Sequence, residues 1–166
     1  MNVSTYARLL FLAGLVLSFG LASGRDAKAG EIAVQAHQVG GVDLALLSVE
    51  RTSGNILTVK WEYRNKTKEK KQLTDQRTGW IDPYRLSSDM YLLDNKHRVK
   101  YTVLVDETKH PVAGKHGGQN EYIFVGPKQT LTTWAKFQAP PADVDKLTIS
   151  IPGVPPFEDV PITIPK

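Results

Sequence analysis

The chain of 166 residues contains no cysteine, and this absence excludes several classes of protein. Disulfide-linked scaffolds, zinc sites built from thiolates, thiol catalysis and lipid-anchored lipoproteins all need a cysteine side chain. Aromatic residues are few, at 8%, and the formal net charge is only +4. The 41% hydrophobic and 23% charged residues are typical of a globular protein and exclude a disordered chain or a collagen-like repeat. The length fits a single domain.

Long apolar runs are also scarce, and the clearest one lies at the N-terminus. Residues 9–22 form an apolar run of 14 residues that follows Arg8. A membrane-spanning helix needs about 20 such residues, so the pattern predicts a secretory signal peptide over residues 1–29, which is cleaved. Cleavage sites with small residues follow Gly24 and Ala29, and the second is favoured because both of its key positions are alanine. A retained anchor is the alternative.

Cleavage changes the charge balance of the protein. Residues 1–29 contain three basic residues and one acidic residue, so the mature chain keeps 18 basic and 16 acidic residues, a net charge of +2. This near-neutral charge and the export signal both argue against a nucleic-acid partner. Export without disulfides is typical of bacteria. We therefore expect a protein of the periplasm or the extracellular medium, with no transmembrane span after cleavage.

The mature chain shows the two-residue alternation of β-strands. In residues 55–65 the apolar residues Leu57, Val59, Trp61 and Tyr63 alternate with polar ones, which predicts a strand with one buried face and Trp61 in the core. Residues 42–49 are also apolar, and the turn residues 53–55 join the two segments into a predicted hairpin.

A second hairpin is predicted from residues 90–93 and 98–106, with its turn at residues 94–97. Val99, Tyr101, Val103 and Val105 are in phase and are expected on its inner side. Further strands are expected at residues 121–125, 129–137, 146–151 and 160–164, and no helical stripe of useful length occurs.

These segments predict an all-β fold, an immunoglobulin-like antiparallel β-sandwich of about seven or eight strands over residues 41–166. Residues 30–40 lack a pattern and are expected to be an N-terminal tail, with loose pairing as an extra edge strand as the alternative. Seven of the ten prolines lie from Pro140 onward. Because proline cannot donate a backbone hydrogen bond, this stretch is expected at a sheet edge.

The last third carries a family resemblance. Residues 134–144 read WAKFQAPPADV, residues 151–153 read IPG, and residues 156–162 read PFEDVPI, while YLLD at residues 91–94 fits the same pattern. Over residues 43–164 the chain resembles bacterial extracytoplasmic Ig-like domains of uncharacterised function. These are similar to the secreted mycobacterial immunoprotective-protein-like families and to domains found beside OmpA-like modules. The resemblance implies a fold and export, but no activity.

Two segments are candidate binding surfaces. The cluster Lys66, Lys68, Lys70 and Lys71 suits an anionic cell-surface polymer or lipid headgroups, or it is a solvated hairpin tip that prevents edge pairing. In the loop of residues 79–84, Trp80 and Tyr84 either form an exposed platform for a sugar or peptide or cap the core.

No catalytic motif is present, and the loop of residues 108–120 offers the one alternative. Its His110 and His116 are candidate metal ligands together with Glu121, or they are solvated loop residues. We therefore expect a non-catalytic exported binding module without a cofactor, with an envelope protein or an anionic cell-surface polymer as its partner. A metal-dependent or enzymatic envelope protein is the alternative, and the oligomeric state stays open.

Overall fold

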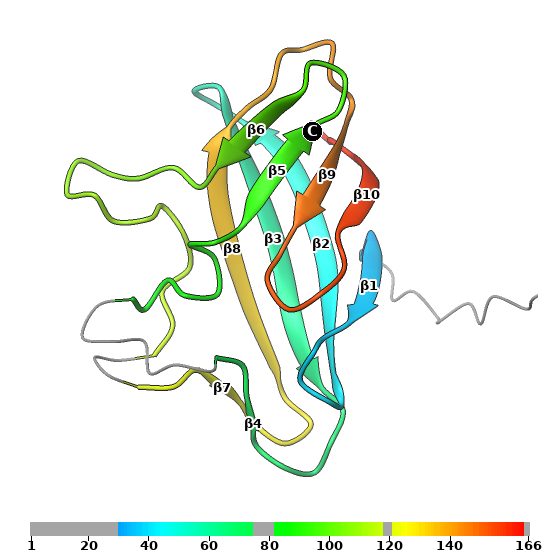
Figure 1. Ribbon diagram of the computed structural model, residues 1–166, viewed down its shortest axis with the longest axis vertical. Coiled ribbons are helices and arrows are strands. Elements are labelled where there is room, and N and C mark those ends of the chain that lie inside the picture. The colour runs from blue at the N-terminus through cyan, green and yellow to red at the C-terminus, as the bar shows by residue number, and fades with distance from the viewer. Residues whose placement is uncertain (1–29, 75–81, 118–120, 165–166) are drawn as a thin grey trace, which may run out of the picture.

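The computed structural model describes residues 30–74, 82–117 and 121–164. Within these ranges the regular structure is entirely β, in ten strands (Figure 1). One four-stranded antiparallel sheet has the order β1-β2-β3-β8, and the other has the order β10-β9-β5-β6. A short pair, β4-β7, lies apart from them. The strands are β1 (Ala33–Ala36), β2 (Val42–Thr52), β3 (Ile56–Asn65), β4 (Lys71–Gln72), β5 (Tyr91–Asp94), β6 (Val99–Thr102), β7 (Phe124–Val125), β8 (Thr130–Gln138), β9 (Lys146–Ser150) and β10 (Phe157–Pro161).

The hairpin β2–β3 confirms the strongest sequence prediction. In its turn Gly54 and Asn55 have φ of 76° and 57°, the left-handed region that these residue types adopt at low cost. Strand β3 then pairs with β8 along its other edge, so it lies inside the sheet. Trp61 is fully buried, as predicted from the alternation.

The hairpin β5–β6 is also confirmed, but its inner face is shorter than predicted. Val99 and Val105 are 40% and 56% exposed, so the prediction that they face the core is wrong. Val99 lies at the turn end of an edge strand, and Val105 follows the end of β6 at Thr102. Tyr101 and Val103 do pack against the core. Alternation placed the residues on one side of a strand, but it did not show where the strand ends.

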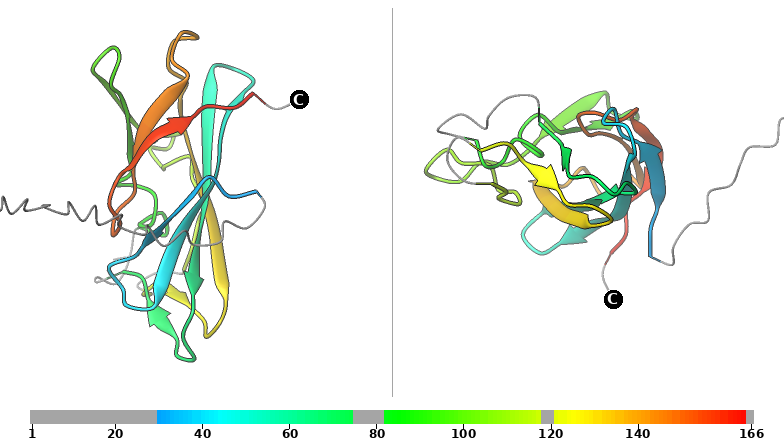
Figure 2. Two further views of the ribbon diagram at one scale, coloured as in Figure 1. Left: turned by 90° about the vertical axis from the view of Figure 1, so that its right-hand side faces the viewer. Right: turned by 90° about the horizontal axis from the view of Figure 1, so that it is seen from below.

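The two large sheets face each other and share one hydrophobic core (Figure 2). Each sheet contributes fully buried side chains to this core. The largest are Leu44, Leu46, Leu57, Trp61, Tyr63 and Phe137 from the first sheet, and Leu92, Leu147 and Ile149 from the second. A protein without disulfides depends on this burial, at about 25 cal/mol per Å² of apolar surface.

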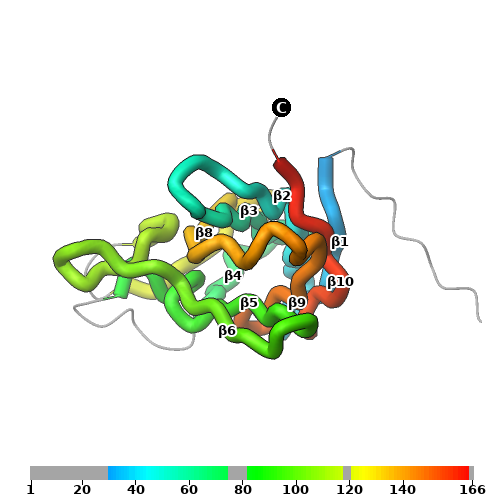
Figure 3. The backbone as a smooth tube through the Cα atoms, turned by 90° about the horizontal axis from the view of Figure 1, so that it is seen from above, coloured from blue at the N-terminus to red at the C-terminus, as the bar shows by residue number. Residues whose placement is uncertain are grey.

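Two irregular segments that follow strands of the second sheet form backbone hydrogen bonds with strands of the first sheet. After β10 the chain joins β2: Thr163 donates its N–H to Val49 O and accepts from Arg51 N–H, both at 2.8 Å. After β6 the chain joins β8, because Leu104 N–H donates to Lys136 O at 2.9 Å. The view from above shows the strands of the two sheets arranged around the core (Figure 3). These segments occupy backbone groups that open sheet edges would expose.

The predictions for the N-terminal tail and for the proline-rich C-terminal stretch are confirmed in part. The expected tail contains β1, which pairs with β2 from Ala33↔Leu46 to Ala36↔Asp43. With β4, this strand raises the number from the expected seven or eight to ten. The proline-rich stretch does lie at an edge, because β10 is the outer strand of its sheet. No helix in the described ranges is long and apolar enough to cross a membrane.

Candidate functional site

The four candidate lysines follow β3 and form part of a compact end of the fold, which we call the lysine end. It consists of residues 37–41, 66–71 and 126–129, at the bottom of Figure 1. Lys66 N–H donates to Gly41 O at 2.9 Å, and Lys128 N–H donates to Thr67 O at 3.0 Å. Three loops that are far apart in sequence are thereby joined by backbone hydrogen bonds.

Asn65 fixes this end from inside. Its side-chain NH₂ donates to Glu69 O, Val125 O and Gly126 O at 2.6, 3.2 and 2.8 Å. Its Oδ1 accepts from both the N–H and the hydroxyl of Thr67. Asparagine suits such a position because one amide group both donates and accepts. The lysines therefore lie in the bonded loop after β3 and at the start of β4. This segment is not a hairpin tip, because β4 pairs with β7 and not with β3. The alternative that the lysines are only solvated stays open.

The lysines differ in how far their charge is compensated. Lys66 forms an ion pair with Asp43, and Lys71 Nζ lies 2.9 Å from Glu69 Oε2. The Lys71 ammonium lowers the pKa of Glu69. Lys70 Nζ lies over the Phe124 ring at 4.1 Å, a cation–π contact.

Two further cations complete this end. Lys68 is exposed. Lys128 was missed at the sequence level: it comes from the turn before β8, and its ammonium donates to Lys66 O. In the described part of the chain, Lys68, Lys70 and Lys128 have no carboxylate partner. The lysine end is therefore a net positive surface.

The aromatic loop is described only in part. Trp80 lies outside the described residues, so its predicted role stays a prediction. Tyr84 is half-buried, packs against the core and contacts the ring of His110 with centroids 6.2 Å apart. This supports the capping interpretation for Tyr84.

The proposed metal ligands are not gathered into a site. His110 is exposed, and its Nδ1 lies 2.8 Å from the Thr108 hydroxyl. The ring of His116 is half-buried, and burial lowers its pKa. Across the described ranges, which include Glu121, no three His, Cys, Asp or Glu side chains are grouped to hold a metal ion.

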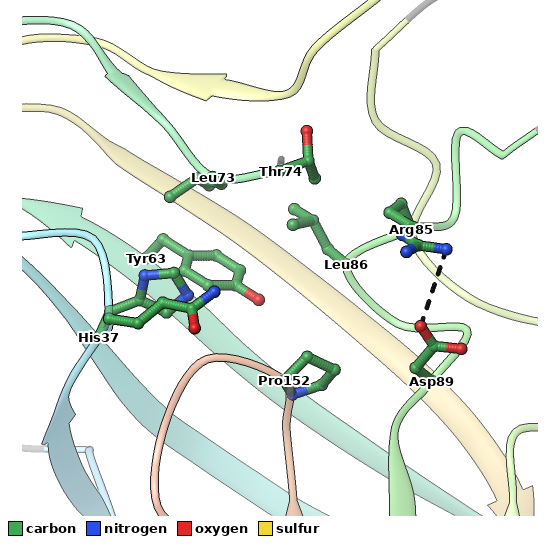
Figure 4. Close-up of a pocket in the computed structure, with 9 residues that line it drawn as sticks. His37, Tyr63, Leu73, Thr74, Arg85, Leu86, Asp89 and Pro152 are labelled. Atoms are coloured by element: carbon green, nitrogen blue, oxygen red, sulfur yellow. Dashed lines mark ion pairs between the residues drawn. The ribbon is translucent and has the colours of Figure 1, made fainter. Parts of the chain in front are cut away.

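A cavity of about 240 Å³ lies beside the lysine end (Figure 4). Five segments form its walls, which explains why no local sequence pattern revealed it. Burial raises the pKa of the Tyr63 phenol in its wall to about 12, so this group stays neutral. The lining residues are His37, Gln38, Tyr63, Leu73, Thr74, Arg85, Leu86, Asp89 and Pro152.

Comparisons with known protein families, curated proteins and solved structures gave no match to this chain. The resemblance to envelope Ig-like domains therefore stays an expectation from the sequence.

Proposed function

We propose that this chain is an exported, non-catalytic immunoglobulin-like β-sandwich that binds an anionic surface of the bacterial envelope through its lysine end. The observation that carries the proposal is the excess of cations there. Five lysines from two separate stretches of chain meet at one end, and two carboxylates compensate two of them.

Charge and rigidity favour binding over a merely solvated surface. Each uncompensated lysine near an anionic surface contributes about 1 kcal/mol, so three contribute about 3 kcal/mol, roughly a hundredfold in affinity. The loops that carry them are already ordered by Asn65, so binding orders less backbone. The signal-peptide pattern of residues 1–29 supports a location outside the cytoplasm for such a surface.

The test uses residues 30–166 and vesicles of phosphatidylglycerol and phosphatidylcholine, with pure phosphatidylcholine vesicles as the neutral reference. We expect co-sedimentation with the anionic vesicles only, and loss of binding in high salt because ions screen the charges. A second arm with an immobilised anionic polysaccharide separates a lipid from a polymer source.

The informative variant changes Lys68, Lys70 and Lys128 to glutamate and leaves the paired Lys66 and Lys71 in place. We expect at least a tenfold loss of binding. A matched control makes the same change at three exposed lysines outside this end, namely Lys60, Lys115 and Lys146. Equal binding by both variants, or binding of the wild type to neither anionic probe, contradicts the proposal.

A further inference from the structure

The cavity beside the lysine end has a mixed lining, with one apolar wall and a charged mouth. Leu73, Leu86 and Tyr63 are almost fully buried where they line it. Arg85 and Asp89 lie at its outer side, with side chains 43% and 63% exposed (Figure 4). A ligand that matches this arrangement has a small apolar part and a polar, charged end.

The charged pair at the mouth retains capacity to bind. Arg85 Nη1 and Asp89 Oδ2 are 3.8 Å apart, beyond the 2.7–2.9 Å of a charge-assisted hydrogen bond. Neither side chain has another hydrogen bond among the described residues that line the cavity. A guanidinium binds a carboxylate well through two parallel N–H groups, and a carboxylate binds an ammonium group.

The turn that carries this pair is held in place by Asp82. Its Oδ1 accepts from Tyr84 N–H at 2.9 Å, its Oδ2 accepts from the Ser88 hydroxyl at 3.0 Å, and its backbone oxygen accepts from Arg85 N–H. Both charged residues therefore project from a bonded turn, so little ordering is needed when a ligand binds.

The opposite wall is equally fixed. His37 Nδ1 accepts from Val39 N–H at 3.1 Å, and its ring meets the Tyr63 ring edge to face with centroids 5.4 Å apart. The imidazole lies directly against Gly153, where φ is 88° and no Cβ would fit. Gln38 N–H donates to Gly153 O at 2.7 Å, which joins this wall to the loop of Pro152.

We propose that this cavity binds a free α-amino acid with an apolar side chain, or the equivalent zwitterionic end group of a small ligand. The carboxylate binds Arg85, the ammonium binds Asp89, and the side chain lies between Leu73 and Leu86. In such a ligand one carbon separates the two charged groups, which suits two rim charges 3.8 Å apart.

The size of the cavity agrees with this class. A cavity of about 150 Å³ holds benzene, and drug-sized ligands occupy about 300–1,000 Å³. The value of about 240 Å³ lies between these limits, which suits a small ligand. This inference goes beyond the proposed function, because it uses residues other than the lysines.

The experiment is isothermal titration of residues 30–166 with L-leucine and L-phenylalanine at millimolar concentrations. L-Leucinamide lacks the carboxylate, N-acetyl-L-leucine lacks the ammonium, and glycine lacks the apolar side chain. We expect each of these three to bind at least tenfold more weakly than L-leucine. This series needs no variant, so it tests the inference whatever a mutation does to folding.

Two variants then test the roles of the two charged residues at the mouth of the cavity. Arg85→Gln is expected to weaken L-leucine binding about tenfold and to leave L-leucinamide unchanged, whereas Asp89→Asn is expected to spare N-acetyl-L-leucine. Arg98→Gln and Asp145→Asn are exposed controls that remove the same charges elsewhere. The inference is overturned if neither amino acid binds, if the truncated analogues bind equally well, or if the rim variants behave like the controls.

Discussion

Replacement of Asn65 by alanine tests how the lysine end is held together. The residue is 4% exposed, and its side chain makes hydrogen bonds to the two loops that carry the lysines and to Val125 O in β7. Alanine removes both halves of the amide. The N–H of Thr67 then loses its acceptor, and three backbone carbonyls lose a donor.

The magnitude follows from these bonds. A net hydrogen bond contributes about 1 kcal/mol, and a buried group left unpaired costs about 1–3 kcal/mol. The bond to Val125 O is buried, whereas those to Glu69 O and Gly126 O are partly exposed, where water replaces part of the loss. We therefore expect Asn65→Ala to reduce the free energy of unfolding by about 2–4 kcal/mol.

Equilibrium unfolding in urea measures this change, and an unchanged m-value shows that the two-state reference holds. Asn95→Ala is the matched control, because that exposed side chain makes one bond, to the Thr148 hydroxyl at 3.0 Å. It should cost less than about 1 kcal/mol. If Asn65→Ala costs no more than the control, the role assigned to Asn65 is refuted.

Two predictions concern pH. Burial raises the pKa of Asp94, but hydrogen bonds from the side chain and N–H of His97 and from Lys96 N–H outweigh this, so the pKa lies below its usual value. Its stabilisation is present above about pH 4 and is lost as the pH falls through the lowered pKa. Asp94→Asn should therefore flatten the fall in melting temperature between neutral and strongly acidic pH, and an unchanged acid slope counts against this. Burial lowers the pKa of His116 in the folded protein. As the pH falls below about 6.5, the imidazole is therefore protonated in the unfolded chain before it is protonated in the folded one. The free energy of unfolding then decreases until the pH reaches the folded pKa. His116→Gln should reduce the difference in urea midpoint between pH 7.5 and pH 5, which lie on either side of the unfolded pKa of about 6.5. An equal difference in wild type and variant contradicts this prediction.

Local patterns predicted much of the fold. The alternation around Trp61 identified a strand with one buried face, and residues 53–55 identified the turn before it. The prolines from Pro140 onward predicted an edge, which β10 occupies. These predictions succeed because side-chain alternation and backbone dihedral preferences are properties of neighbouring residues.

The limits of such patterns appear where contacts are distant in sequence. Val105 continues the alternation of β6, yet it is exposed because the chain has already left the sheet to join β8. The short strand β4 carries no signal of its own, since two residues gain their conformation from pairing with β7. Tertiary contacts decided both outcomes.

The candidate site divides in the same way. The lysine cluster was evident from the sequence, because its members are close neighbours in the chain. Lys128 belongs to the same surface only because backbone hydrogen bonds bring its turn against Thr67. The cavity depends still more on the fold, since Arg85, His37 and Pro152 meet only when loops from both sheets pack around Tyr63. The sequence by itself determined the strand-forming segments and the residues that avoid water, whereas strand pairing, which depends on contacts far apart in the chain, decided which side chains share a surface.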